Sequence, residues 1–260
     1  MDYRFHMEVS GDGPGVVFLH GAPQDPADMS RLAELIVAEF RVCVVHLPGY
    51  GHSPIWPETP YRIPAVGRAL ARALAERGLT GSALVGMSGG SYRAFQLALD
   101  HPELEVAAMA HLGVTANLDD ANREAMRGFG QALAAGVDMI EPGVARAFGP
   151  AYRAEHPREA REVIGRMLAS VDPAGAEAEL NGFAELDDLL PRLGALDTPT
   201  YLRVGELDAA TPPDYARAAA ERLPSAEIDV VPGVGHMLPY EDRDGTVSAV
   251  RAFLRDHVAT

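Results

Sequence analysis

The sequence predicts an α/β fold in which helices flank a mostly parallel central sheet and a helical cap is inserted into the chain. Short apolar stretches of strand length alternate with amphipathic helical patterns over the first 112 residues. Such alternation produces parallel βαβ units, with helices covering both faces of the sheet. The alternation stops after Leu112 and resumes at Thr200. A connection between strand and helix usually needs only ~2–6 residues, so this interval predicts an insertion.

The individual elements follow from apolar periodicity and from glycine and proline signals. A first strand ends before the glycine-rich turn at 11–15, and later strands are predicted at 16–19, 42–47, 82–87, 106–112, 200–204 and 227–231. Core helices are predicted at 28–40, 63–77, 89–99, 213–223 and 242–257. Further helical patterns are found at 119–135, 143–148, 158–171 and 174–186. We therefore expect a core of residues 1–114 and 191–260 and a helical cap of residues 115–190.

The composition disfavours several classes of function. The formal net charge of −15 disfavours binding to nucleic acid or to anionic membrane surfaces. All 22 basic residues are arginines, which excludes lysine-based catalysis and a P-loop lysine. The single cysteine, Cys43, cannot form an internal disulfide or a cysteine metal site, and we expect no metal or organic cofactor. Without a signal segment or an apolar run of ~20 residues, a soluble cytoplasmic protein is expected. The sequence leaves its oligomeric state open, with a monomer and a homodimer as the candidates.

A nucleophile is predicted at Ser88, within Gly86-Met-Ser-Gly-Gly90. This G-x-S-x-G pattern follows an apolar strand and opens a helix, which is the context that a nucleophile elbow requires. The sharp turn predicts a strained backbone with a positive φ at the serine, and the small glycines avoid clashes there. Taken alone, the motif could also be a glycine-rich turn with an N-cap serine.

A base and an acid are predicted in the last third of the chain. A serine hydroxyl needs a base to remove its proton, and His236 follows the last predicted strand. Asp208 follows the preceding strand and would orient the histidine. The carboxyl ends of parallel strands meet at one edge of a sheet, so both loops should lie beside Ser88. Glu206 is the nearest rival acid; the aspartates at 119–120 are better explained as first-turn acids of a cap helix.

Two backbone amides are predicted to form an oxyanion hole. One belongs to Gly89, which follows the nucleophile at the start of its helix. The other belongs to Ala22, in the loop His-Gly-Ala-Pro at 20–23 that follows an early core strand. We also expect a cis peptide bond before Pro23, because this loop has to turn sharply.

These motifs together resemble the α/β-hydrolase family over nearly the whole chain. The loop at 20–23 is similar to the family's HGxP motif, and 47–53 is similar to its LPGxGxS segment, although His46 stands where the family usually has Asp. The cap and the last third most resemble 3-oxoadipate enol-lactonases and related small esterases, at 148–157, 170–175 and 208–213. The resemblance implies an α/β-hydrolase fold and a serine hydrolase. Ser88 argues against the relatives of this family that use an aspartate nucleophile.

We therefore expect hydrolysis of a small carboxylic ester or lactone through a Ser-His-Asp triad and an acyl-enzyme intermediate. C–C bond hydrolysis and peracid formation on the same triad are alternatives, and non-catalytic binding of a small molecule is a third interpretation. The cap is expected to control substrate choice rather than the bond-breaking step. The candidate pocket residues are Trp56, Tyr92, Met126, Phe129 and Leu133. Arg123 and Arg127, four residues apart, could bind a substrate carboxylate or simply form a solvated helix face.

Overall fold

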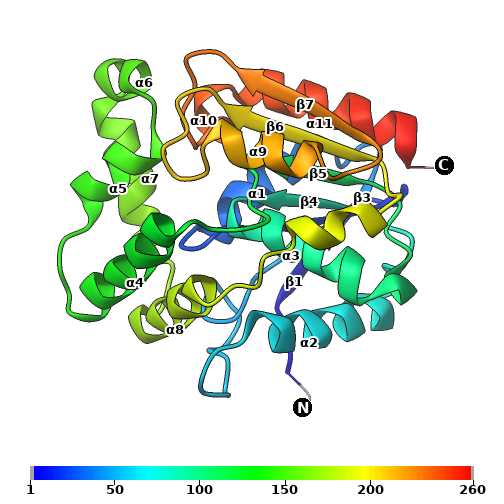
Figure 1. The fold of residues 1–260 in the computed structure, drawn as a ribbon, viewed down its shortest axis with the longest axis horizontal. Coiled ribbons are helices and arrows are strands. Elements are labelled where there is room, and N and C mark those ends of the chain that lie inside the picture. The colour runs from blue at the N-terminus through cyan, green and yellow to red at the C-terminus, as the bar shows by residue number, and fades with distance from the viewer. Residues whose placement is uncertain (1–2, 259–260) are drawn as a thin grey trace.

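A seven-stranded sheet lies at the centre of the computed structural model, which describes residues 3–258. The strand order is β1-β3-β2-β4-β5-β6-β7, and all neighbours are parallel except β1, which is antiparallel to β3 (Figure 1). The strands are β1 (Met7–Ser10), β2 (Gly15–Leu19), β3 (Arg41–Val45), β4 (Ala83–Met87), β5 (Met109–Leu112), β6 (Thr200–Gly205) and β7 (Ala226–Val231). This arrangement confirms the predicted α/β-hydrolase fold.

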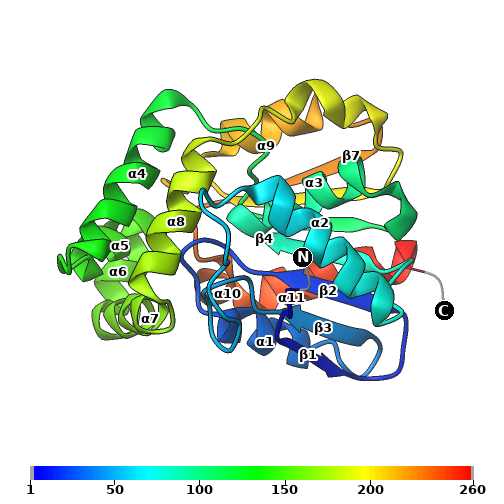
Figure 2. The same ribbon diagram turned by 90° about the horizontal axis from the view of Figure 1, so that it is seen from below.

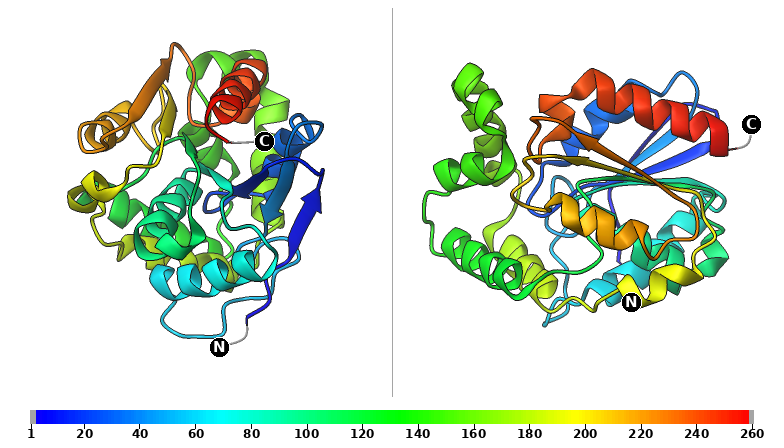
Figure 3. Two further views of the ribbon diagram at one scale, coloured as in Figure 1. Left: turned by 90° about the vertical axis from the view of Figure 1, so that its right-hand side faces the viewer. Right: turned by 45° about the horizontal axis from the view of Figure 1, so that its top comes forward.

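Helices cover both faces of this sheet (Figure 3). One face is covered by α1 (Pro26–Glu34) and α11 (Arg243–His257), and the other by α2 (Ile63–Glu76), α3 (Gly89–Asp100) and α9 (Pro213–Ala220). The side chains of β2 show how one strand serves both layers. Val16 and Phe18 pack with the α1 side, whereas Val17 and Leu19 pack with the α2 side, as the two-residue period of a strand requires.

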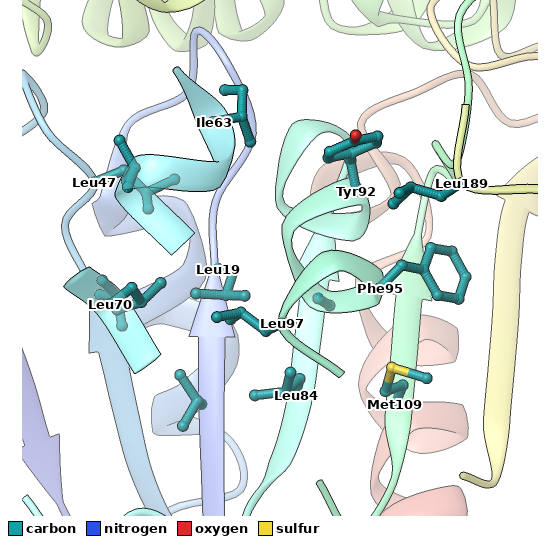
Figure 4. Packing of buried hydrophobic residues seen from close by; sticks show 14 of the residues in the cluster. Leu19, Leu47, Ile63, Leu70, Leu84, Tyr92, Phe95, Leu97, Met109 and Leu189 are labelled. Carbon is teal, nitrogen blue, oxygen red and sulfur yellow. The ribbon is translucent and has the colours of Figure 1, made fainter. Parts of the chain in front are cut away.

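The layer beneath α2 and α3 is built from large, fully buried side chains (Figure 4). Leu19 and Leu84 of the sheet face Leu70 of α2 and Leu97 of α3. Tyr92 lies in the same layer, and its hydroxyl donates to the Asp187 carbonyl at 3.1 Å. Burying each such side chain stabilises the folded state by about 1.5–3 kcal/mol. The packing of this layer therefore holds α3 in place, together with the turn at its start.

The remaining helices between β5 and β6 form a separate group at one end of the sheet (Figures 1 and 2). They are α4 (Asp120–Ala134), α5 (Ile140–Ala147), α6 (Pro150–Glu155), α7 (Pro157–Ala169) and α8 (Pro173–Ala184), which we call the helical insertion. Within it, α4 packs against α8 and α5 against α7. No helix within residues 3–258 is long and apolar enough to cross a membrane.

Several element boundaries differ from the predicted ones. The helix predicted at 28–40 is α1, which begins earlier because Asp25 accepts a hydrogen bond from Ala27 N–H at 3.0 Å and Pro26 occupies the first turn. The helix ends at Glu34, and residues 35–40, which the apolar spacing had included in the predicted helix, form turns and a bend. Four short helices were not predicted from the sequence: α6, α10 (Leu238–Glu241), and the 3₁₀ helices η1 (Pro102–Leu104) and η2 (Leu190–Ala195).

Candidate active site

Ser88 occupies the sharp turn between β4 and α3. Its backbone angles are φ 53° and ψ −117°, so the predicted positive φ is confirmed. A Cβ added at Gly86 would lie 2.4 Å from the Gly90 carbonyl oxygen, and one added at Gly90 would lie 2.0 Å from the Leu19 carbonyl oxygen. Both positions therefore require glycine. The turn leaves the Ser88 side chain partly exposed at the end of a buried strand.

Asp208 and His236 meet at the same edge of the sheet. His236 Nδ1 lies 2.7 Å from Asp208 Oδ2, and both side chains are largely buried. The other carboxylate oxygen of Asp208 accepts backbone N–H groups from Ala210 at 2.8 Å and Thr211 at 2.7 Å. Thr211 Oγ1 donates to Asp208 Oδ2 at 2.9 Å. This network fixes the carboxylate so that the imidazole proton lies on Nδ1 and Nε2 is free to act as a base.

Ser88 and His236 line the same cavity, but the structure records no hydrogen bond between Ser88 Oγ and the ring of His236 among the described residues. The predicted geometry is therefore found for the acid–base pair and not for the serine–base pair. Hydrogen bonds of this type are often long without substrate and tighten in the reacting complex.

The loop after β2 is held by its own polar residues. The buried His20 ring donates from Nδ1 to the Gly21 carbonyl at 2.7 Å and accepts the Leu47 N–H at Nε2 at 3.0 Å. Gln24 Oε1 accepts the Gly21 N–H at 2.6 Å. The Ala22–Pro23 peptide bond is cis, as predicted. These contacts occupy the backbone of Gly21. Ala22 lines the cavity in the loop after β2, the strand next to β4, and its N–H donates no hydrogen bond among the described residues.

The cavity has a volume of about 230 Å³ and lies between the carboxyl edge of the sheet and the helical insertion. Met126 and Phe129 line it, together with further apolar residues of the insertion: Met139, Ile164, Met167, Leu168 and Leu180. Of the other predicted pocket residues, Trp56 and Tyr92 are buried in the core layer beside α2 and α3, and Leu133 packs against that layer. The sequence showed that Trp56 and Tyr92 are large and aromatic, but it did not show whether their rings would pack in the core or line the cavity.

Neither Arg123 nor Arg127, for which the sequence left carboxylate binding and a solvated helix face open, lines the cavity. Arg123 donates to the carbonyls of Leu118 and Ala184 at 2.9 and 3.0 Å, so it joins α4 to the end of α8. Arg127 makes an ion pair with Glu185 at 2.7 Å on the surface. Arg146 of α5 lines the cavity instead. Arg146 lies within the helical pattern predicted at 143–148, but that pattern did not indicate which face of the helix would meet the cavity.

Gln24 and Thr211 were also missed. Gln24 accepts the Gly21 N–H and also donates to Met87 Sδ at 3.0 Å. Thr211 donates to Asp208 from its backbone N–H and its hydroxyl, and the hydroxyl lies 3.3 Å from His236 Nδ1. An aspartate followed three residues later by a threonine is a local turn pattern that could have identified Thr211. The contact of Gln24 with Met87 joins segments distant in sequence and has no such local signal.

One cluster of potential metal ligands lies among the described residues, outside the cavity. Ligand atoms of His6, Glu8 and His46 all lie within 4.8 Å of one another. His46 Nδ1 accepts the backbone N–H of His52 at 3.1 Å, so the ring proton lies on Nε2, which faces Glu8 Oε1 at 3.2 Å. This tautomer leaves no free ring nitrogen on His46 for a metal, and it gives a structural role to the residue that replaces the family's usual Asp.

An elbow serine, an Asp–His pair and a loop with an unused amide, gathered at the carboxyl edge of a parallel sheet, define the hydrolase class. The family model described as the alpha/beta hydrolase fold matches residues 14–243. The chain belongs to the alpha/beta hydrolase fold family.

Esterases are among its relatives. A pimeloyl-[acyl-carrier protein] methyl ester esterase of Aeromonas hydrophila is 32% identical over 88% of this chain and 91% of the relative. The corresponding esterase of Xanthomonas campestris is 29% identical over 96% and 98%. The structure of a thermophilic esterase from Thermogutta terrifontis with malate bound has a TM-score of 0.88 and 30% identity, covering 98% of this chain and 94% of that one. The chain is thus a hydrolase that acts on ester bonds, while the finer resemblance to enol-lactonases stays a prediction.

Proposed function

We propose that this chain hydrolyses small carboxylic esters or lactones with Ser88 as nucleophile, His236 as general base and Asp208 as the acid that orients the histidine. The observation that carries the proposal is the 2.7 Å contact between His236 Nδ1 and Asp208 Oδ2, in a histidine that shares its cavity with Ser88. The esterase relatives support an ester as the bond that is cleaved.

The geometry supports the following sequence of steps. His236 Nε2 takes the proton of the Ser88 hydroxyl as the oxygen attacks the ester carbonyl. The developing oxyanion is bound by the amides of Ala22 and Gly89, and Gly89 is the first residue of α3, where the helix leaves its N–H groups unpaired. The imidazolium then gives its proton to the leaving alcohol. Water attacks the acyl-enzyme with His236 again as base, and the acid is released.

The cavity restricts the substrate by size and polarity. A volume of about 230 Å³ accommodates a small acyl group, and its walls are mainly apolar side chains of α4, α5, α7 and α8. Such a wall excludes water and so strengthens the interactions with the oxyanion. Long or bulky acyl groups would need displacement of the insertion.

Hydrolysis of p-nitrophenyl acetate tests this proposal. The Ser88→Ala and His236→Ala variants should lose nearly all activity, and Asp208→Asn should lower kcat about 10³- to 10⁴-fold. A fluorophosphonate probe should label the wild type and not Ser88→Ala. Asp214→Asn is the matched control, because Asp214 is an exposed aspartate of α9.

The outcomes separate the alternatives. Turnover that survives Ser88→Ala would refute the proposed nucleophile. A wild type that binds esters without turnover would favour the binding protein. Labelling without ester hydrolysis would direct attention to C–C bond hydrolysis or peracid formation on the same three residues.

A further inference from the structure

Arg146 brings a positive charge into a wall that is otherwise mainly apolar. Among the described residues that line the cavity, Arg146 alone carries a permanent charge. It belongs to the last turn of α5 and is half-buried. Ser88 and His236 line the same cavity, so a molecule that fills it touches both the guanidinium and the nucleophile.

The protein leaves most of the Arg146 donors unused. The described residues give its guanidinium one hydrogen bond, from one terminal nitrogen to Asn122 Oδ1 at 2.7 Å, and no ion pair. By contrast, the arginines at 93, 166 and 203 each pair with a carboxylate. A guanidinium has five N–H donors, so Nε and the second terminal nitrogen of Arg146 remain available.

An unpaired charge against apolar walls is unfavourable unless a ligand completes it. Burial lowers the pKa of Arg146, and the carboxylates of Asp208 and Asp119 act in the opposite direction. Arginine stays protonated under these conditions, so the charge persists. Asn122 is itself held by Asp119 and by Tyr215, and this fixes the direction of the guanidinium.

We propose that Arg146 is a substrate-binding residue that accepts a carboxylate at the end of the substrate remote from the scissile bond. The proposal rests on the proposed ester hydrolysis and names its substrate class: monoesters of short dicarboxylic acids, or lactones that carry a carboxylate. Guanidinium and carboxylate pair through two parallel hydrogen bonds, which gives both affinity and orientation. The surrounding apolar side chains would contact the methylene spacer between the two ends.

Matched ester pairs provide the test. Monomethyl and dimethyl esters of succinate, glutarate and adipate differ in one charge, and methanol release measures both. The wild type should prefer the monoesters, with one spacer length giving the highest kcat/KM. The Arg146→Met variant should lose about 10- to 100-fold in kcat/KM for the best monoester and change little for its diester. Arg146→Lys should retain part of the preference. Arg158→Gln, which removes an exposed arginine of α7, is the control.

Binding to the Ser88→Ala variant separates this proposal from the proposed reaction. Calorimetry with monomethyl glutarate should show binding to Ser88→Ala, weakened at least tenfold in Ser88→Ala/Arg146→Met. Equal binding by both variants would overturn the carboxylate site even if the esterase activity stands. An equal loss of kcat/KM for monoester and diester in Arg146→Met would also overturn it, because Arg146 would then only position the insertion.

Discussion

The backbone carbonyl of Ala147 accepts the backbone N–H of His236 at 2.9 Å. It also accepts the N–H of Met237 at 3.0 Å. Ala147 is the last residue of α5, so the end of an insertion helix holds the loop that carries the proposed base. The sequence predicted an insertion that acts only on substrate choice. The contact shows that its α5 end is joined to the histidine loop directly.

Glu241 strengthens this junction from the other side. One oxygen of its carboxylate accepts the N–H groups of Gly149 at 2.8 Å and Gly235 at 2.9 Å, and the other accepts that of Met237 at 3.2 Å. A glutamine side chain has one oxygen that accepts and one NH₂ group that donates. In Glu241→Gln the NH₂ group would therefore face a backbone N–H that now donates to a carboxylate oxygen. We expect kcat to fall about 10- to 100-fold, because the His236 loop shifts, with KM changed much less.

Steady-state kinetics with p-nitrophenyl acetate, together with the rate of fluorophosphonate labelling, measure that effect. Glu227→Gln is the control, because Glu227 is an exposed residue of β7. An unchanged kcat in a folded Glu241→Gln variant would show that Ala147 alone is sufficient to position the loop.

A buried ion pair joins the insertion to the core at a second place. Arg93 of α3 pairs with Glu179 of α8, and their side chains are 3% and 0% exposed. Removing one partner leaves a buried charge uncompensated, so Glu179→Gln should lower the free energy of unfolding by about 3–5 kcal/mol. Urea denaturation measures this loss. The double variant Arg93→Met/Glu179→Leu should lose less than Glu179→Gln, and Glu162→Gln at an exposed pair should change stability by less than about 1 kcal/mol.

The location of the proposed site could be predicted from the sequence because its residues follow strands of the parallel sheet. Ser88 follows β4 and His236 follows β7. Because parallel strands end at the same edge of a sheet, the local sequence pattern predicted that both residues would lie at that edge, and they line one cavity there. Arg146, Glu241 and the Arg93–Glu179 pair could not be predicted in the same way. Their roles depend on contacts between helices distant in sequence, and the direction in which a helix faces its neighbours is fixed only by packing of the whole layer.

Two buried histidines should make the protein sensitive to acid. Burial lowers the pKa of His20 and of His111 from 6.5 to about 3. Between these values the unfolded chain binds more protons than the folded one, so stability rises with pH and falls as pH drops below 6.5. Each histidine contributes a slope approaching about 1.4 kcal/mol per pH unit in that window. His111→Gln should reduce the slope by about that amount.

Urea denaturation at a series of pH values between 4 and 7 provides the measurement. Only the slope is diagnostic, because His111→Gln also breaks the 2.8 Å contact with Ser91 and lowers stability at every pH. His156→Gln removes a half-exposed histidine of the insertion and should leave the slope unchanged. If His111→Gln has the wild-type slope, then His111 is protonated in the folded protein or the acid sensitivity arises from carboxylates alone.

The two ends of the insertion should differ in their effect on catalysis. Phe129 of α4 lines the cavity, so Phe129→Ala should shift selectivity toward longer acyl groups while the rate of fluorophosphonate labelling at Ser88 stays within a few-fold of wild type.

Gly149 follows α5, and a Cβ there would lie 2.8 Å from Glu241 Oε2 and 3.1 Å from Gly235 N. Gly149→Ala should therefore disturb the His236 loop and slow labelling at least tenfold, with no preference among acyl lengths. Labelling rates and a series of p-nitrophenyl esters from acetate to octanoate measure both effects, and Gly128→Ala, where an added Cβ meets nothing within 4 Å, is the control. Slow labelling in Phe129→Ala, or normal labelling in Gly149→Ala, would show that the insertion does not divide its roles in this way.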